Sequence, residues 1–363
     1  MIIENERILM FEKSMNLGGS SQIVIQMCEA LRCRAQKVIV CSMGGINTKK
    51  LEEIAVKHYD IRDISDKKNF FWNYQKLKEI IRNEKITVIH THHRMAAMYA
   101  QILRIHFKCK VFCSIHGEFY DKKWFTKIAY RNCKLIACGN AVKNNLINEF
   151  GIDGKNIFVL QNAIERDQKY EVIDEIEQLR SQSNETFFAG YLGRLSVEKG
   201  VDVFIKSLKE VLKKNKQIYY VIVGEGYQRE ELTQLAYDLG VDSHIIFLGY
   251  RKDPQNVIQQ LDVVVLSSYT EGLPLTPIEA FAHGKPVVAT SVGGTSEIVV
   301  NGYNGILVEA GNIQMIENAI IKISKNRKLY NKLATNAINT YDCKFSYSIF
   351  EGSFIKIYEM LYD

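Results

Sequence analysis

The sequence predicts an α/β protein made of two parallel sheets, each flanked by helices. Short apolar runs of strand length alternate with stretches that carry apolar residues at helical spacing, for example residues 201–212 and 229–239. This alternation is typical of parallel sheets with helices on both faces. A chain of 363 residues is also too long for one ordinary hydrophobic core, so we expect two Rossmann-like halves.

The runs that we predict as strands form one series in each half. In the first half they lie near residues 8–11, 37–41, 87–90, 111–114, 134–138 and 157–160. In the second half they lie near residues 187–192, 219–223, 245–248, 263–266, 286–289 and 305–308. Each run has the length of a buried strand. The two series therefore predict one sheet in each half.

The boundary between the halves is predicted in the charged stretch 165–184. We place the first domain at residues 1–165 and the second at residues 166–344. Residues 171–177 fit either a linker or the first helix of the second domain. The tail, about 345–363, carries Phe, Tyr, Ile and Leu at helical intervals, so we expect a final helix that packs back on the first domain.

Composition is that of a globular protein, with 47% hydrophobic and 24% charged residues and only four prolines. The apolar runs are too short for a transmembrane helix, and residues 1–10 lack the features of a signal peptide. The eight cysteines form no CxxC pair, as expected for reduced thiols. These features predict a cytoplasmic protein.

Charge is unevenly distributed in a chain whose net charge is +6. Residues 1–165 hold 26 Lys and Arg against 16 Asp and Glu, a balance of +10, and the rest hold 21 against 25, a balance of −4. The asymmetry indicates that the first half meets an anionic surface or substrate, although ordinary solvated charge explains any single lysine. Residues 119–125 interleave aromatic and basic side chains, which fits a membrane interface or, slightly better, a core helix with a charged face.

Two carboxylates stand around a turn between a strand and a helix in the second half. Glu271 and Glu279 are eight residues apart in the segment 267–280, which follows the apolar run 263–266. Open α/β sheets bind ligands beyond the carboxyl ends of their strands, close to helix N-termini. Two acids at that place suit a ligand rich in hydroxyl groups.

Two cations stand at another junction of this kind. Arg194 and Lys199 lie between Gly193 and Gly200, after one predicted strand and before the next helix. A planar fork donor, a point charge and free backbone N–H groups suit a pyrophosphate. A strand–helix turn with incidental surface cations fits these residues equally well.

Glycines close two more strands of the second half. Gly224 and Gly226 begin a dinucleotide fingerprint, but Arg229 stands where the third glycine belongs, so an NAD-dependent oxidoreductase loses its support. A tight turn that lines a ligand pocket is the better interpretation. Gly249 and Tyr250 close the next strand, where backbone groups and a stacked Tyr250 or Arg251 suit a nucleotide base, although a plain turn fits equally well.

Glycine and histidine residues mark strand ends in the first half. Gly18 and Gly19 precede a predicted helix and fit either a plain turn or close approach to a ligand. His116 ends another strand, although a lone histidine is more often structural than chemical. Histidines also gather at 90–93, but without an Asp, Glu or Cys partner at metal-ligand spacing, so we predict no metal site.

Taken in their order along the chain, these residues resemble the retaining family-4 glycosyltransferases of the GT-B fold. The matching residues are Gly18-Gly19, His116-Gly117, Gly193-Arg194 with Lys199, Gly224-Glu225-Gly226, Gly249 and Glu271-x7-Glu279. The resemblance spans essentially the whole chain. It implies two Rossmann-like domains that face a deep cleft, with the acceptor on the first domain, the nucleotide-sugar donor mainly on the second, and a C-terminal helix that crosses back to the first.

The resemblance also implies catalytic roles for four residues. Arg194 and Lys199 are expected to neutralise the donor diphosphate and to stabilise the leaving nucleotide. Glu271 is expected to bind hydroxyl groups of the donor sugar as a ligand rather than as a nucleophile. His116 is expected to contact the transferring sugar.

Further residues are implied in donor binding. Glu279 is expected to bind the ribose hydroxyls, and Gly249 and Tyr250 the base. Gly18 and Gly19 are expected to approach the phosphates from the opposite wall. The full set implied for the donor is Gly18, Gly19, Gly193, Gly224, Gly249, Tyr250, Leu275, Thr276 and Glu279.

The implied activity is a retaining transfer of a hexose or N-acetylhexosamine to a sugar or lipid-linked glycan, in bacterial surface polysaccharide synthesis. We expect UDP because it is the commonest donor nucleotide of such enzymes. Neither metal nor other cofactor is expected, because two cations already face the diphosphate. The expected partners are the nucleotide sugar, the acceptor and an anionic membrane touched peripherally by residues 1–165, with no nucleic acid. Two alternatives stay open: a GT-B sugar-nucleotide epimerase and a non-catalytic partner subunit.

Overall fold

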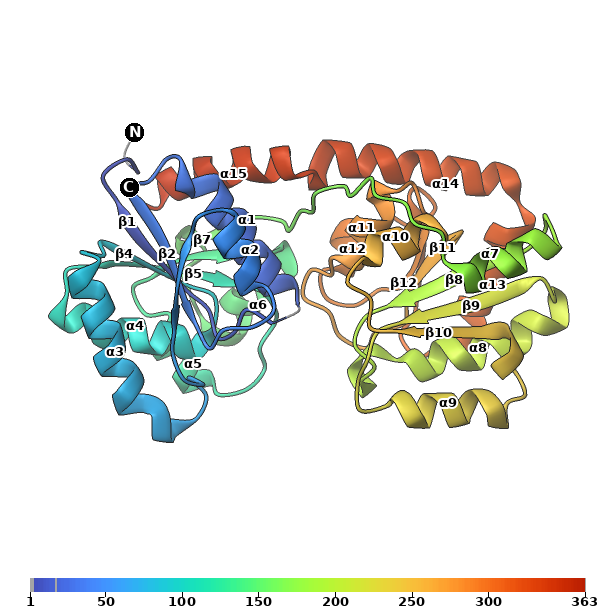
Figure 1. Cartoon of the computed structure of the whole chain (residues 1–363), viewed down its shortest axis with the longest axis horizontal. Helices are drawn as coiled ribbons and strands as arrows, with labels where there is room; N and C mark the ends of the chain where they lie inside the picture. The colour runs from blue at the N-terminus through green and yellow to red at the C-terminus, as the bar shows by residue number, and fades with distance from the viewer. Residues whose placement is uncertain (1–2, 17, 363) are drawn as a thin grey trace. The chain divides into compact units, whose positions relative to one another are not determined.

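The computed structural model describes residues 3–16 and 18–362, which form two compact units (Figure 1). One unit comprises Met1–Asn162 together with Tyr347–Asp363, and the other comprises Ala163–Ser346. Each unit contains one parallel sheet with helices packed against it. The predicted α/β class with two Rossmann-like halves is therefore confirmed.

The first unit is built on a seven-stranded sheet with the order β3-β2-β1-β4-β5-β6-β7. Its strands are β1 (Arg7–Phe11), β2 (Lys37–Ser42), β3 (Lys57–Asp60), β4 (Val88–Thr91), β5 (Lys110–Ile115), β6 (Lys134–Ala137) and β7 (Ile157–Val159). Its helices are α1 (Gly19–Arg32), α2 (Thr48–Glu53), α3 (Phe70–Asn83), α4 (Arg94–His106), α5 (Lys123–Ala129), α6 (Asn140–Phe150) and α15 (Tyr347–Met360).

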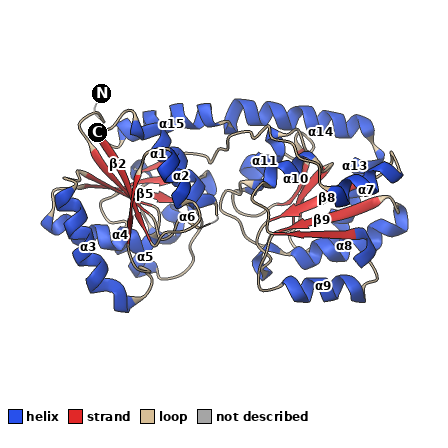
Figure 2. Ribbon diagram, viewed as in Figure 1, coloured by secondary structure: helices blue, strands red, loops and turns tan. Residues whose placement is uncertain are grey.

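The second unit is built on a six-stranded sheet with the order β10-β9-β8-β11-β12-β13. Its strands are β8 (Phe187–Leu192), β9 (Ile218–Val223), β10 (Ile245–Gly249), β11 (Val263–Leu266), β12 (Val287–Thr290) and β13 (Gly305–Val308). Its helices are α7 (Asp174–Gln182), α8 (Val201–Lys214), α9 (Arg229–Asp238), α10 (Pro254–Gln259), α11 (Thr276–Ala282), α12 (Thr295–Ile298), α13 (Ile313–Lys325) and α14 (Arg327–Thr340). Figure 2 shows strands in the middle of each unit and helices around them.

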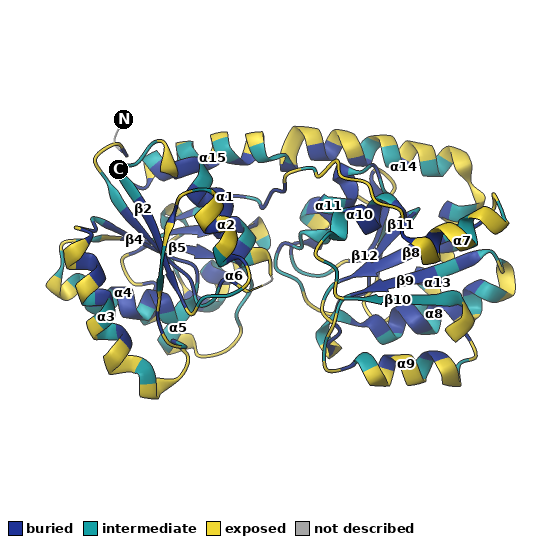
Figure 3. Ribbon diagram, in the orientation of Figure 1, coloured by how far each residue is buried: buried dark blue, intermediate teal, exposed yellow. Residues whose placement is uncertain are grey.

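Burial explains why the apolar runs become strands. All four residues of β11 are buried, as expected for a parallel strand covered by helices on both faces (Figure 3). The helix α8 buries Phe204, Leu208 and Val211, which recur at helical spacing on the face toward the sheet. The ring of Phe204 stacks on Tyr220 of β9 with centroids 4.0 Å apart. The apolar pattern thus fixes both the elements and their packing.

Two details of the prediction are settled by the structure. Residues 171–177 do not form a simple linker, because α7 begins at Asp174 and belongs to the second unit. The edge strand β3 was missed, because its sequence Lys57–Asp60 is polar and its residues are exposed or half-buried. An edge strand faces solvent on one side and therefore lacks the continuous apolar run of an inner strand.

The last helix, α15, returns to the first unit, as predicted. It packs against α1, where the Tyr347 hydroxyl donates a hydrogen bond to the Gln26 carbonyl at 3.4 Å. An ion pair of 2.8 Å joins Arg34 to Glu351 of α15. The side chains of Phe350, Phe354 and Tyr358 are buried. The first unit therefore draws part of its core from the end of the chain.

Each sheet has one point at which the strand order reverses. In the first unit this switch point lies between β1 and β4, and in the second unit between β8 and β11. Connections leave in opposite directions on the two sides of a switch point, so a crevice opens at the carboxyl ends of these strands. Ligand-binding side chains are therefore expected on the loops that follow β1, β4, β8 and β11.

Among the helices within residues 3–16 and 18–362, none combines the length and the apolar character needed to cross a bilayer.

Candidate active site

The loops after β8 and β11 bring a lysine and a carboxylate together at the switch point of the second unit. Lys199 Nζ lies 2.7 Å from Glu271 Oε1, and both side chains are mostly covered. The same Oε1 accepts a hydrogen bond of 2.6 Å from Ser268 Oγ. Oε2 of Glu271 has no hydrogen-bond partner in the described part of the chain, so it is available to a ligand. Ser268 was missed by the sequence analysis, although it stands in the same strand–helix segment as Glu271.

Arg194 stands on the loop after β8 and keeps its guanidinium exposed. The side chain is 69% exposed, and its ion pair with Glu198 is 3.7 Å long. An exposed pair of this kind contributes little to stability, so the guanidinium can turn toward an anion at small cost. The loop itself is anchored, because the Tyr191 hydroxyl donates to the Arg194 carbonyl at 2.9 Å.

Glu279 lies in the first turn of α11, where desolvation raises the pKa of its carboxyl to about 7. The carboxyl makes no hydrogen bond or ion pair with residues that the structure describes. The helix begins at Thr276, and Leu275 is its N-cap residue. The Thr276 hydroxyl donates to the Leu192 carbonyl at 3.4 Å, which ties the start of α11 to the end of β8. A half-buried acid without a partner is thus held beside the loops that carry Lys199 and Arg194.

Three predicted glycines hold the ends of β8, β9 and β10 together. Gly224 has a φ of 134°, and a Cβ at this position would lie 1.8 Å from the carbonyl oxygen of Gly193. The Gly224 N–H donates to the Gly249 carbonyl at 2.8 Å. Close packing of backbone on backbone therefore requires glycine at position 224, whatever ligand binds. The roles of these glycines in donor binding stay predictions.

The two residues after Gly249 differ: the ring of Tyr250 is exposed, whereas the guanidinium of Arg251 is paired with an acid. Tyr250 exposes its side chain. Arg251 instead forms two hydrogen bonds of 2.9 and 2.7 Å with Asp253. Of the two side chains, Tyr250 is therefore the one available to stack on a base.

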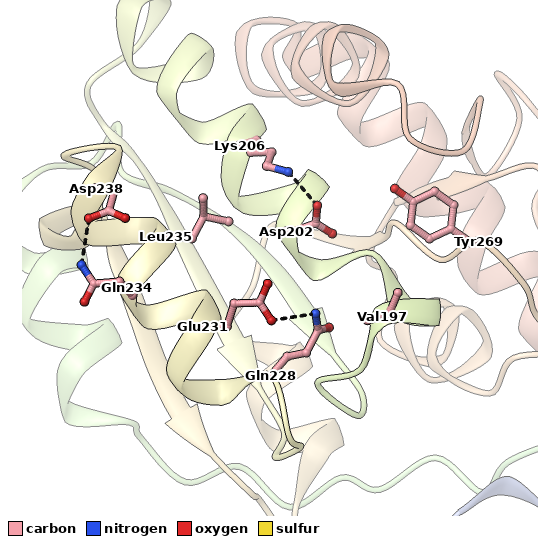
Figure 4. Close-up of a pocket in the computed structure, with 9 residues that line it drawn as sticks. All are labelled: Val197, Asp202, Lys206, Gln228, Glu231, Gln234, Leu235, Asp238 and Tyr269. Atoms are coloured by element: carbon pink, nitrogen blue, oxygen red, sulfur yellow. Dashed lines mark hydrogen bonds and ion pairs between the residues drawn. The ribbon is translucent and has the colours of Figure 1, made fainter.

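A shallow groove of about 530 Å³ lies between α8 and α9 and reaches Val197 and Tyr269 (Figure 4). Its polar groups bond one another: Lys206 pairs with Asp202 at 2.8 Å, and Gln228 and Gln234 donate to Glu231 and Asp238 at 3.2 and 2.8 Å. Three acids against one lysine give this lining a net negative charge. A diphosphate would be repelled there, so the groove is not its expected site, and the prediction that Arg194 and Lys199 bind it stays a prediction.

Gly18 and Gly19 stand at the start of α1, after β1. Gly18 has a φ of 156°, and a Cβ built there meets no heavy atom within 4 Å. Ser21 Oγ lies 2.6 Å from the Asn16 carbonyl oxygen and 3.0 Å from that of Gly18, which fixes the turn. The open space leaves the backbone accessible to a ligand.

His116 is grouped with two side chains at the switch point of the first unit. His92 Nδ1 and His116 Nε2 lie 3.1 Å apart, and the two rings stack with centroids 5.4 Å apart. Glu12, His92 and His116 each bring one ligand-type atom within 4.8 Å of the other two. Glu12 and His92 are buried, and His116 is half-buried. Burial raises the pKa of Glu12 to about 8, lowers that of His116 to about 4, and lowers that of His92 well below its usual value.

Residue spacing gave these histidines no acidic partner, but the fold brings Glu12 close to His92 and His116. The absence of a metal stays a prediction. Glu12 directly follows β1, His92 follows β4, and the two strands are neighbours in the sheet. Spacing along the chain hides this proximity, because a parallel sheet brings strand ends together from distant segments. Glu12 itself carried a usable signal, since it is an acid placed directly after an apolar strand.

The preference for a core helix at residues 119–125 is also wrong. The helix α5 begins only at Lys123, and Tyr120 and Trp124 are 71% and 75% exposed. The guanidinium of Arg94 covers the ring of Phe119, with its carbon 4.0 Å from the ring centroid. The alternative, that residues 119–125 lie at a membrane interface, stays a prediction. The exposed side chains of Tyr120 and Trp124 fit it.

Comparison with known families matches both units. A model described as Glycosyltransferase Family 4 matches residues 17–168, and one described as Glycosyl transferases group 1 matches residues 172–340. The two models together span nearly the whole chain, in the order of its two units.

Curated relatives and solved structures agree with the family models. The chain is 26% identical to an Escherichia coli UDP-Gal:α-D-GlcNAc-diphosphoundecaprenol α-1,3-galactosyltransferase over 89% of both chains. It is 26% identical to the capsular polysaccharide biosynthesis glycosyltransferase CapM of Staphylococcus aureus over 59% of this chain and 55% of CapM. The structure of Anabaena HepE in complex with UDP and glucose superposes with a TM-score of 0.86 and 22% identity, over 98% of this chain and 100% of HepE.

Proposed function

Because this chain belongs to the group 1 glycosyltransferases of family 4 and has the GT-B fold, we propose that it is a retaining hexosyltransferase. The donor we propose is a UDP-linked hexose or N-acetylhexosamine, and the acceptor a sugar or lipid-linked glycan of a bacterial surface polysaccharide. Support comes from the E. coli galactosyltransferase, whose name gives UDP-galactose and an undecaprenyl diphosphate-linked sugar. The name of CapM gives capsular polysaccharide biosynthesis, which supports the proposed pathway. The HepE structure contains UDP, which supports the proposed donor nucleotide.

The observation that carries the proposal is the Lys199–Glu271 pair beside Arg194. An ammonium has three N–H donors, and the bond to Glu271 uses one of them, so two remain for oxygens of a diphosphate. Glu271 likewise keeps Oε2 for a sugar hydroxyl, because Lys199 and Ser268 share its Oε1. One half-buried ion pair thus joins a phosphate ligand to a sugar ligand.

The reaction separates charge, because the nucleoside diphosphate leaves with the bonding electrons and the sugar becomes oxocarbenium-like. In our proposal Arg194 and Lys199 stabilise the negative charge that develops on the diphosphate. The leaving phosphate helps to deprotonate the acceptor hydroxyl on the face that it leaves, which retains the anomeric configuration. With two cations at this place, the proposed transfer needs no divalent metal.

The remaining donor contacts follow the same assignment. Glu279 accepts hydrogen bonds from the ribose hydroxyls, which explains why a half-buried acid is left without a protein partner. Tyr250 stacks on the base next to the backbone of Gly249. Leu275 and Thr276 offer the backbone N–H groups of the first turn of α11.

The first unit is proposed to take the acceptor. Its Gly18 and Gly19 offer an open backbone to the donor phosphates, and His116 bonds a hydroxyl of the transferring sugar. Its net positive charge suits a lipid diphosphate in an anionic membrane. Trp124 and Tyr120, exposed beside Lys122 and Lys123, suit contact with the membrane interface. We therefore propose a cytoplasmic enzyme that docks peripherally on the inner face of the membrane.

Donor screening tests the proposal. Thermal shift with UDP-, GDP- and ADP-sugars is expected to show the largest stabilisation with a UDP-sugar. Slow release of UDP from that sugar without acceptor, unchanged by EDTA, is expected to follow. Larger stabilisation by a GDP-sugar or an ADP-sugar would show that the proposed base is wrong. Loss of turnover in EDTA would show that the enzyme needs a metal ion. Formation of an epimerised nucleotide sugar, or complete absence of donor binding, would contradict the transferase.

A further inference from the structure

Tyr227 lies on the loop after β9 and contacts the neighbouring loop, which carries Arg194 and Lys199. Its side chain is 74% exposed. Its hydroxyl oxygen nevertheless accepts a hydrogen bond of 3.1 Å from the backbone N–H of Val197. Val197 begins the short 3₁₀ turn Val197–Lys199, which leads into α8. An exposed tyrosine on one loop is therefore bonded to the turn that presents Lys199.

The N–H of Val197 needs a partner from outside its own turn. The first N–H groups of a helical turn have no acceptor within it, and a side chain at the preceding position often caps them. Ser196 stands at that position, but its side chain makes no cap hydrogen bond. Tyr227 supplies the bond from the neighbouring loop instead. It thus caps the turn, although it is distant from the turn in the sequence.

The rest of this loop is anchored on both sides of the turn. Before the turn, the Leu195 N–H donates to the Glu225 carbonyl at 3.0 Å. At the turn's far side, the Tyr269 N–H donates to the Glu198 carbonyl at 2.8 Å. Between these anchors the chain is open to solvent, since the side chain of Val197 is 58% exposed. The tyrosine hydroxyl therefore ties down the exposed middle of the loop.

We propose that Tyr227 is a positioning residue for Lys199: its hydroxyl caps the turn and so keeps the Lys199 ammonium where the donor diphosphate leaves. The role of Lys199 rests on the function proposed above, whereas the cap does not. The turn fixes the backbone from which Lys199 reaches Glu271 at 2.7 Å. Catalysis by a preorganised group depends on such placement, because a misplacement of about 1 Å can cost a factor of 10².

The alternative is that Tyr227 occupies an N–H that a phosphate oxygen of the donor would otherwise bind. Helix N-termini bind phosphates through groups of this kind. In that case the tyrosine would compete with the donor, and its loss would tighten donor binding. The anchors on both sides of the Val197 bond support the cap, because they already hold the rest of the loop in a fixed course.

Amide hydrogen exchange tests the cap without reference to activity. Tyr227→Phe removes the hydroxyl and keeps the ring. Tyr237→Phe is the matched control, because Tyr237 is 70% exposed on α9 of the same unit. In NMR of 15N-valine-labelled protein, we expect the Val197 amide to exchange several-fold faster in Tyr227→Phe and at the native rate in Tyr237→Phe. An equal rate in all three proteins would overturn the proposal.

Kinetics test whether the cap acts through Lys199. In donor hydrolysis we expect Tyr227→Phe to lower kcat roughly threefold to tenfold, with the donor KM nearly unchanged. Added to Lys199→Met, the same change should alter kcat by less than about twofold, because the group through which it acts is gone. Equal losses in both backgrounds, or a lower donor KM in Tyr227→Phe, would overturn the positioning role.

Failure of this proposal and failure of the proposed function give different results. Absence of any turnover by the native protein would defeat the proposed function, and the role of Lys199 with it. Amide exchange at Val197 would still decide whether Tyr227 caps the turn. Normal turnover with unchanged exchange and unchanged kcat in Tyr227→Phe would overturn the positioning role alone.

Discussion

The two switch points hold polar groups of opposite character. In the second unit, Lys199 and Glu271 form an ion pair of 2.7 Å with Arg194 exposed on the same loop. In the first unit, Glu12, His92 and His116 are buried or half-buried, and desolvation favours their neutral forms. The same sheet geometry thus supports a charged site and a neutral one. In the function proposed above, the charged site neutralises a leaving anion, whereas the neutral one contacts hydroxyl groups without adding charge.

The largest expected effect comes from removing the charge at the second switch point. Lys199→Met should lower kcat for donor hydrolysis by about 10²–10³, because one preorganised stabilising group is lost. It also leaves Glu271 mostly buried with no cation, so the Tm should fall. Steady-state kinetics and thermal melting measure the two effects.

The groove between α8 and α9 supplies the control for that change. Lys206→Met removes a lysine that pairs with Asp202 in the groove, and it should leave kcat nearly unchanged. If Lys206→Met were as harmful as Lys199→Met, the groove and not the switch point would hold the diphosphate. The comparison between the two units would then fail.

A change of pH is expected to have an intermediate effect on donor binding, through the titration of Glu279. Its pKa is raised to about 7, so the carboxyl is ionised above pH 7 and protonated below it. Only the carboxylate accepts both ribose hydroxyl bonds, so donor Kd should rise as pH falls below 7, by up to about tenfold per pH unit. Calorimetric titration with a UDP-sugar between pH 6 and 8 measures this slope.

Glu279→Gln sharpens the same test, because its amide has a similar size and does not titrate. We expect weaker binding with a flat pH profile. An unchanged slope in this variant would assign the titration to another group and would remove Glu279 from the ribose.

The smallest expected effect concerns the surface of the first unit. Trp124→Ala should weaken binding to anionic vesicles roughly threefold, because one interfacial aromatic ring is lost, and should leave donor hydrolysis unchanged. Tyr237→Ala is the matched control, since this tyrosine is 70% exposed on α9 of the second unit. Flotation of native protein that is independent of anionic lipid would contradict the membrane proposal.

The inner strands could be predicted from the sequence because burial on both faces demands continuous apolar runs. The run that became β11 is the clearest example, since all four residues are buried. β3 escaped prediction because its residues are polar or half-buried at the sheet edge. The exposure of Trp124 could not be predicted either, because an aromatic side chain gives the same sequence signal in a core and at an interface.

Some residues of the candidate site could be predicted from the sequence, and others could not. Glu271, Glu279, Arg194 and Lys199 were recognisable because each stands in a short strand–helix junction with a distinctive local pattern. Glu12 was not recognisable as a partner of His116, because 104 residues separate them along the chain and only the order β1-β4-β5 joins them. Local pattern thus predicts single residues at strand–helix junctions. Which of them meet, as Lys199 meets Glu271 across the loops after β8 and β11, needs the sheet.

The return of α15 to the first unit has a consequence for the order of folding during synthesis. Phe350, Phe354 and Tyr358 fill part of the first unit's core, yet the ribosome makes them after the whole of Ala163–Ser346. The second unit, although later in the sequence, can complete its core first. The nascent first unit meanwhile exposes the surface of α1 against which α15 packs in the folded chain. A chaperone that binds nascent chains should therefore occupy α1 until α15 has been made.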